Sequence, residues 1–238
     1  MTNLKNWKMH LPIDAKGGKT GAAWQIIDLI GFNHPPYFVQ NADGSLTFSA
    51  PVDGAKTSSN TKYARSELRE MNLKADGSQG TEAVWTLKQG GTMRCQMTVD
   101  KTPTQKDGKP GHQVIGQIHG AKDELVRLYR EGSGALEFHC DHALKDNKEH
   151  VFKLVDKDGK QAVLPLCKKF DYTIQASLAN VTVSAVIDGV VYRASLVPNA
   201  GWAKDHFYFK SGVYLGVNAA QGGKGDGGVT IHAIEVSH

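Results

Sequence analysis

Val114-Ile115-Gly116-Gln117-Ile118-His119 is the stretch from which the fold of this chain is best read. Its apolar and β-branched residues lie between two glycines, a pattern typical of a buried β-strand. Because side chains alternate along a strand, one face should carry Val114, Gly116 and Ile118, and the other Ile115, Gln117 and His119. The first face suits a core, and the second presents an amide beside an imidazole. Such a pair on an antiparallel sheet is often only solvated or structural, so other segments must decide.

Two further segments show the same alternation. The first, Arg65-Ser66-Glu67-Leu68-Arg69, puts its two arginines and its glutamate on one face. These charges indicate either a salt-bridge ladder on a solvated sheet or a guanidinium fork for a carboxylate, held in place by Glu67. The second, residues 208–216, has a core face of Phe209, Val213 and Leu215 and a polar face of Tyr208, Lys210, Gly212 and Tyr214.

Turn signals between short β-rich runs indicate the fold class. Seven Asp-Gly dipeptides start at Asp43, Asp53, Asp76, Asp107, Asp158, Asp188 and Asp226. Such dipeptides are frequent in tight turns, and their spacing favours an all-β sandwich or barrel over alternating β and α units. At 238 residues the chain should form one domain, because no linker divides it.

The composition narrows the classes of partner. The formal net charge of +4 suits a polyanionic ligand without requiring one. No basic run is interleaved with aromatic residues, and no stretch approaches the length of a membrane span, so neither nucleic acid nor a membrane is expected as a partner. His139-Cys140-Asp141-His142 has metal-ligand residue types without a recognised zinc spacing, so no metal is expected there.

Neither the cysteines nor the N-terminal residues indicate whether the protein is exported from the cell. Cys95, Cys140 and Cys167 are too few and scattered for a disulfide framework. Three buried thiols are expected, with one disulfide and a free thiol as the alternative. The first residues lack the apolar segment of a signal peptide, so the protein is either made without export or begins here at its mature domain.

The three polar-faced segments closely resemble, in the same order, the three signature segments of polysaccharide lyase family 7, the alginate lyases. The opening Trp7-Lys8-Met9-His10-Leu11-Pro12 and the closing Ile234-Glu235-Val236-Ser237-His238 also look like that family's ends. The resemblance implies a single-domain β-jelly-roll sandwich over residues 1–238, with two antiparallel sheets and a concave substrate cleft. It further implies a monomer that needs no cofactor and is secreted or periplasmic, although a cytoplasmic location stays open.

The reaction implied by the resemblance is β-elimination in a 1,4-linked uronate chain. The C5 proton is removed, the bond from C4 to oxygen breaks, and a 4,5-unsaturated sugar is left. By resemblance, the catalytic residues are Arg65 and Gln117 at the uronate carboxylate, His119 as the base for guluronate, and Tyr214 as the acid. Those expected to bind or orient the substrate are Glu67, Arg69, Lys210 and Tyr208. Cationic neighbours are expected to favour the phenolate of Tyr214, and His119 should be neutral near physiological pH.

Substrate preference is less well predicted. In the family, an isoleucine at the position of Ile118 tends to accompany acceptance of guluronate, so an endo-acting enzyme for guluronate-containing blocks is the leading expectation. Gly216 departs from the family, which usually has glutamine there. Two alternatives remain: a lectin-like jelly roll that binds acidic polysaccharide without cleaving it, and a lyase for another uronan such as polyglucuronate. A His/Tyr acid–base pair is not needed for binding alone and argues against the lectin.

Overall fold

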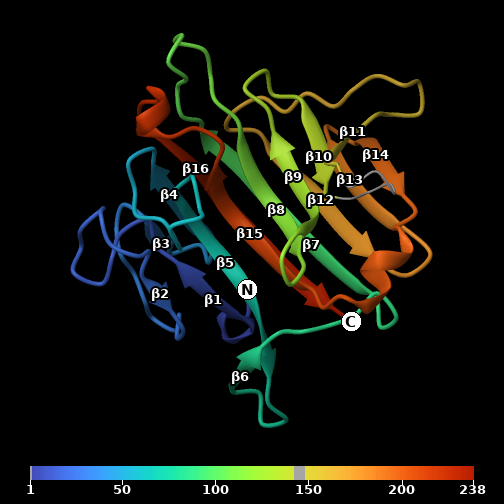
Figure 1. Ribbon diagram of the computed structural model, residues 1–238, viewed down its shortest axis with the longest axis horizontal. Coiled ribbons are helices and arrows are strands. Elements are labelled where there is room, and N and C mark those ends of the chain that lie inside the picture. The colour runs from blue at the N-terminus through green and yellow to red at the C-terminus, as the bar shows by residue number, and fades with distance from the viewer. Residues whose placement is uncertain (1, 142–147) are drawn as a thin grey trace.

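The computed structural model describes residues 2–141 and 148–238 and consists of two antiparallel β-sheets packed face to face (Figure 1). The nine-stranded sheet has, in order, β11 (His150–Lys153), β10 (Leu136–Cys140), β9 (Glu124–Arg130), β8 (Gln113–His119), β15 (Tyr208–Leu215), β5 (Arg65–Leu73), β1 (Trp7–His10) and β2 (Gln25–Ile26), and β6 (Gln79–Glu82) pairs with β5. The seven-stranded sheet has, in order, β14 (Val190–Leu196), β13 (Val181–Ile187), β12 (Lys169–Ala176), β7 (Gly91–Lys101), β16 (Asp226–Ser237), β4 (Leu46–Pro51) and β3 (Phe38–Gln40). The predicted all-β sandwich is confirmed.

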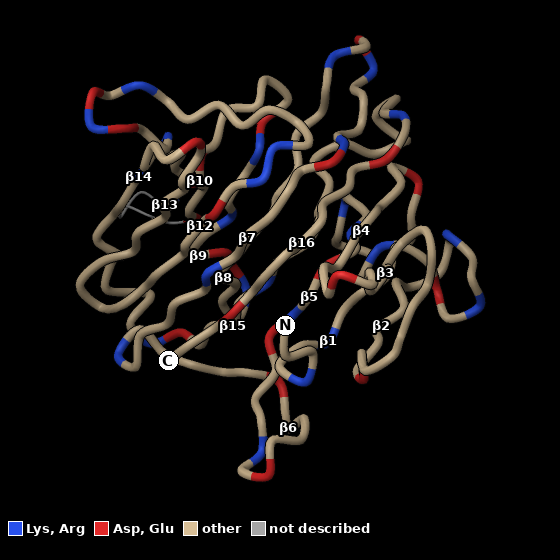
Figure 2. Tube along the Cα trace, turned by 180° about the vertical axis from the view of Figure 1, so that it is seen from behind, with Lys and Arg blue, Asp and Glu red and all other residues tan. Residues whose placement is uncertain are grey.

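Helical structure is confined to three short 3-10 turns, η1 (Leu4–Asn6), η2 (Ala200–Lys204) and η3 (Ala219–Gln221), in the part of the chain that is described. None of these helices is long or apolar enough to cross a membrane. Turn chemistry accounts for the hairpins: Asp188 and Gly189, both with positive φ, join β13 to β14 as the Asp-Gly signal predicts. The β5–β6 hairpin extends beyond the sandwich and carries charged residues at its tip (Figure 2).

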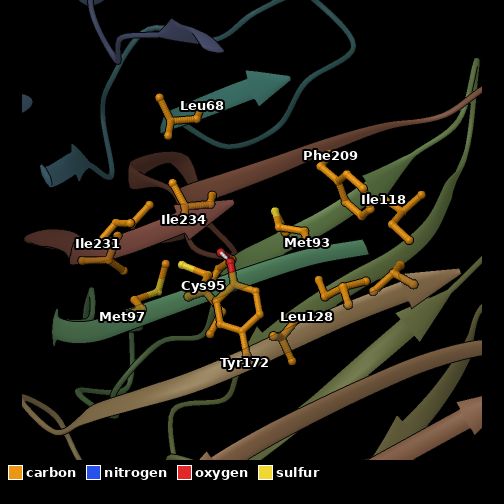
Figure 3. Packing of buried hydrophobic residues seen from close by; sticks show 14 of the residues in the cluster. Leu68, Met93, Cys95, Met97, Ile118, Leu128, Tyr172, Phe209, Ile231 and Ile234 are labelled. Atoms are coloured by element: carbon orange, nitrogen blue, oxygen red, sulfur yellow. Dashed lines mark hydrogen bonds between the residues drawn. The ribbon is translucent and has the colours of Figure 1, made fainter. Parts of the chain in front are cut away.

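The core lies between the two sheets and is filled by the apolar faces of their strands. One residue of the seven-stranded sheet, Tyr172, crosses this core (Figure 3). Its hydroxyl donates to the carbonyl oxygen of Ile115 at 3.0 Å and lies 2.8 Å from the hydroxyl oxygen of Ser211. Because β8 and β15 carry these two residues, Tyr172 ties both strands to the opposite sheet through a buried polar contact.

A β-bulge corrects the expected alternation along β8. Between Ser211 and Tyr214 the pairing of β15 with β8 shifts, and β8 shifts against β9 at the same place. Ile115 therefore lies in the core and not on the face of Gln117 and His119, as strict alternation predicted. Val114 instead pairs directly with Tyr214 on one side and Tyr129 on the other.

The cysteines are all free, but the expectation of three buried thiols is wrong for one of them. Cys95 and Cys140 are buried, whereas Cys167 is exposed. Cys167 lies in a turn, has a φ of 59°, and is held by its backbone N–H, which donates to the carbonyl of Val99. Its thiol donates to the carbonyl oxygen of Asp100 at 3.6 Å.

Candidate active site

The three strands that carry the sequence signatures are neighbours in the middle of the nine-stranded sheet, in the order β8-β15-β5. Their register places Lys210 opposite both Gln117 and Arg69. Tyr208 pairs with His119, and Tyr214 pairs with Arg65. Residues directly opposite in a sheet point to the same side, so segments far apart in sequence form one polar surface on the face away from the core. We call this surface the cleft face.

A cleft of about 530 Å³ lies on this face, and six of the eight predicted residues line it. They are Arg65, Arg69, His119, Tyr208, Lys210 and Tyr214. A loop over residues 57–63 contributes Thr57, Asn60, Thr61, Lys62 and Tyr63 to the wall. The other two predicted residues, Glu67 and Gln117, lie beneath this surface and are only 1% and 0% exposed.

Glu67 is the centre of a buried charge cluster. The Nζ of Lys210 lies 2.5 Å from its carboxylate, the Nη1 of Arg65 lies 3.5 Å away, and the side-chain amide of Gln117 donates to it. Burial by itself raises the pKa of Glu67, but the two cations outweigh burial and hold the pKa below its ordinary value. Glu67 is therefore ionised and keeps two cations and one amide in place.

Two arginine side chains stack on the two tyrosines of the cleft. The guanidinium carbon of Arg65 lies 3.8 Å from the ring centre of Tyr214, and that of Arg69 lies 3.9 Å from the ring centre of Tyr208. These cation–π contacts fix the rings. Burial nevertheless raises the pKa of Tyr214, and Arg65 offsets this only in part. The cations were expected to favour a phenolate, but the raised pKa means that Tyr214 holds its proton.

His119 is held in one tautomer. Its Nδ1 lies 2.6 Å from the carbonyl oxygen of Gly120, and because a carbonyl only accepts, Nδ1 carries the proton. Nε2 is then left with a free lone pair. The ring stacks on Tyr208 with centres 5.1 Å apart. Burial, followed by the charge of Lys210, lowers the pKa of His119 to about 4, so the imidazole is neutral at physiological pH, as expected.

A sequence model of the alginate lyase family matches residues 2–238, nearly the whole chain. The chain belongs to the alginate lyase family. A curated alginate lyase of Klebsiella pneumoniae is 30% identical over 276 residues, which cover 99% of this chain and 89% of that protein.

Solved alginate lyase structures also share the fold. The crystal structure of the alginate lyase from Klebsiella pneumoniae superposes with a TM-score of 0.80 at 26% identity, covering 99% of this chain and 96% of that one. Alginate lyase AlgAT5, described as a member of polysaccharide lyase family 7, gives a TM-score of 0.76 at 28% identity, covering 100% and 96%. The Corynebacterium sp. enzyme gives 0.75 at 26% identity, covering 100% and 96%. The recognised family is thereby confirmed.

Sequence reasoning missed several cleft residues of this alginate lyase family member. His10 on β1 lines the cleft, and burial together with Lys210 and Arg65 lowers its pKa to about 3. Alternation in Trp7–His10 could have assigned His10 to the polar face, but not its place opposite Glu67. Glu124 and Arg127 on β9 also line the cleft, and no motif marks them.

The departure at Gly216 has a structural counterpart. A Cβ built on Gly216 would lie 1.9 Å from the ring of His112, so that ring fills the space that a side chain at 216 would need. The His112 ring packs edge-on against Tyr129, with centres 5.6 Å apart. The place where a side chain at position 216 was expected is therefore taken by the ring of His112.

A metal site does not assemble from the sequence His139-Cys140-Asp141-His142 as far as it is described. Cys140 is buried in the core, whereas His139 contacts Tyr129 and Glu137 on the cleft face, and His142 lies outside the described residues. In the described part of the chain, one other group could hold a metal ion: Glu131, Glu137 and His139, with potential ligand atoms within 4.8 Å of one another.

Proposed function

We propose that the protein cleaves alginate by β-elimination, with Arg65, Gln117, His119 and Tyr214 as its catalytic residues. The observation that carries this proposal is the strand register, which sets a protonated tyrosine and a neutral histidine on one cleft face among buried cations. An acid that holds its proton and a base that is free of one are the two groups that elimination needs.

The substrate carboxylate is the first problem that the site has to solve. The C5 proton of a uronate is hardly acidic while the adjacent carboxylate keeps its full charge. Arg65 and Lys210 line the cleft, and both are held by Glu67 from below. Fixed cations at the carboxylate stabilise the enolate-like intermediate that forms when the C5 proton leaves. Gln117 is fully buried and donates to Glu67, so its proposed contribution is to complete this support and offer its remaining N–H.

The proton transfers follow from the directions in which the pKa values of His119 and Tyr214 are shifted. For guluronate, His119 Nε2 takes the C5 proton, and the electron pair of the C–H bond forms the C4–C5 double bond as the bond from C4 to oxygen breaks. Tyr214 donates its phenolic proton to the leaving oxygen. For mannuronate, whose C5 hydrogen lies on the other side of the ring, Tyr214 serves as both base and acid. Arg69, Tyr208 and Glu67 bind the substrate or hold the catalytic groups.

We also propose endo action on guluronate-containing blocks by a monomer made of one domain. The support for a guluronate preference is the unprotonated Nε2 of His119, which can serve as the base. Ile118 lies in the core, so its influence on preference would be indirect. Both sheets share one core, which supports a single-domain enzyme.

The test is incubation with polyguluronate, polymannuronate and polyglucuronate separately, following the near-ultraviolet absorbance of the unsaturated product. Absorbance should rise with the two alginate blocks and faster with polyguluronate. No rise with any polymer would favour the lectin-like alternative, and a rise with polyglucuronate alone would overturn the substrate assignment.

A further inference from the structure

Glu124 lies beside the base without belonging to any of the three sequence signatures. It begins β9 and lines the cleft, and its Oε1 lies 3.5 Å from Nε2 of His119. The other imidazole nitrogen, Nδ1, is already bound to the carbonyl of Gly120. The nitrogen that would take the C5 proton therefore has a carboxylate within reach, and the ring cannot turn away without losing its stacking on Tyr208.

The surroundings of Glu124 hold it in this position. Asp141, which follows β10, accepts from the backbone N–H of Glu124 at 3.0 Å and donates its own N–H to the Glu124 carbonyl, also at 3.0 Å. The Nη2 of Arg127 lies 2.7 Å from Asp141 and also contacts Glu149. Several charged or titratable groups face Glu124: His119 on β8, Lys210, Tyr208 and Tyr214 on β15, Arg127 and Tyr129 on β9, Lys122 in the preceding loop, and Asp141.

Glu124 has a higher proton affinity than His119. Burial, followed by the hydrogen bond with Asp141, raises the pKa of Glu124 to about 7. The pKa of His119 lies at about 4. A proton placed on the imidazole is therefore better held by the carboxylate beside it. A base of such low proton affinity is weak by itself, and a neighbouring carboxylate stabilises the imidazolium as it forms.

We propose that Glu124 is a positioning residue that receives from His119 the proton taken from the substrate. The inference rests on the proposed role of His119 and adds the next step. The C5–H bond breaks and an Nε2–H bond forms, while the electron pair of the C–H bond forms the C4–C5 double bond. The bond from C4 to oxygen breaks at the same time, and the leaving oxygen takes the phenolic proton of Tyr214. The Nε2–H bond then breaks, an O–H bond forms on Glu124, and the imidazole returns to its neutral state. Glu124 releases the proton to water in the cleft, and Tyr214 regains one from water, so no other reactant is needed.

Glu124→Gln tests the relay, because glutamine keeps the size and hydrogen bonding but cannot accept the proton. With polyguluronate, kcat should fall about 10- to 100-fold while KM stays within about twofold, a loss at or below the lower end of general acid–base effects. With polymannuronate, where Tyr214 does both transfers, the loss should stay below about threefold. The matched control is Glu235→Gln on the opposite sheet, where the side chain is 71% exposed and far from the cleft.

The pH profile separates proton transfer from a structural role. Because Glu124 must be ionised to accept a proton, wild-type kcat on polyguluronate should rise with pH through about 7, and this limb should vanish in Glu124→Gln. Asp141→Asn offers a second variant: it removes a group that raises the pKa of Glu124, so the limb should move to lower pH.

The outcomes test the proposed roles of Glu124 and His119 separately. Suppose that Glu124→Gln keeps both its kcat and the rise of kcat with pH, while His119→Ala loses polyguluronate cleavage. This result would overturn the relay through Glu124 but leave His119 as the base. Full activity of His119→Ala on polyguluronate would instead overturn the proposed base. Equal losses of Glu124→Gln on both polymers would also contradict the relay, because a structural defect does not distinguish the substrates.

Discussion

Replacing Glu67 with glutamine removes the negative charge that two cations share beneath the cleft. Glu67 is 1% exposed and Lys210 is 3% exposed, so water cannot take the place of the lost partner. Removing one member of a buried ion pair costs about 3–5 kcal/mol of stability, because the remaining charge stays buried and unpaired. Glutamine has nearly the size of glutamate, so the effect reports the charge and not a cavity.

The expected change in Tm follows from this free energy. In a chain of this length, each kcal/mol lost at the transition lowers Tm by about 2–4 °C, so Glu67→Gln should unfold about 6–20 °C below the wild type at pH 7. The deficit should shrink as pH rises toward 8. Burial, followed by the charge of Arg65, lowers the pKa of Lys210 to about 8 in the wild type, and Glu67 opposes this shift. Without Glu67 the pKa of Lys210 falls further, so Lys210 loses its proton at a lower pH and the unpaired charge disappears.

Thermal unfolding followed by circular dichroism between pH 6 and 9 is the assay. The double variant Glu67→Gln/Lys210→Met should recover much of the loss, since it removes both buried charges. Glu235→Gln, an exposed control, should change stability by less than about 0.5 kcal/mol. If Glu67→Gln has the same Tm as the wild type at pH 7, the idea that Glu67 holds the cations of the cleft is refuted.

Three other substitutions test the site. Tyr214→Phe should lower kcat on both alginate blocks by about 10²- to 10⁴-fold with little change in KM, as expected for loss of a general acid, and near-normal initial rates would contradict its role. Burial depresses the pKa of His10 to about 3, so the unfolded chain binds a proton there between pH 6.5 and 3 that the folded chain does not. The stability of His10→Gln relative to wild type, measured by urea unfolding, should therefore rise by up to about 1.4 kcal/mol per pH unit as pH falls through that range, and a constant difference would refute the assignment. Gly212→Ala, at a φ of 143° and with its Cβ only 2.6 Å from the carbonyl oxygen of Ser66, should lose at least about 1–3 kcal/mol of stability, and activity with it; an unchanged Tm would contradict the strain.

Alternation along strands predicted the face of the charged and aromatic side chains of the cleft, but not that of Ile115, which the bulge moves into the core. Lys210 was assigned to the polar face by alternation with Phe209, and it lies in the cleft while Phe209 lies in the core. How deeply each of these side chains is buried could not be predicted from alternation. Glu67 and Gln117 were assigned to binding and catalysis, but they lie beneath the surface, because the sequence does not tell which members of a polar face are covered by longer neighbours.

Residues from outside the signatures escaped prediction for a different reason. Glu124 reaches His119 only because β9 pairs with β8, where the register shifts between Ile118 and His119. A shift of one residue changes which side chains share a face, and nothing in the local sequence marks it. The protonation of Tyr214 depends likewise on burial by distant segments, so the cationic neighbours alone suggested a phenolate that burial prevents.

The bulge at Ile115 sets how Tyr214 on β15 lies relative to Gln117 and His119 on β8. Lys210 pairs with Gln117, and a regular antiparallel ladder from that pair would set Tyr214 opposite Gln113; instead it is opposite Val114. The shift turns Gln113 into the core, where both of its polar side-chain atoms are buried and, among the described residues, have no hydrogen-bond partner. Unpaired buried polar groups cost about 1–3 kcal/mol each, so a regular strand would be more stable. The irregular strand is held at Ile115, whose carbonyl oxygen accepts from the hydroxyl of Tyr172 on the opposite sheet and from that of Ser211 on β15. These contacts lie beside the register shift that sets Tyr214 opposite Val114.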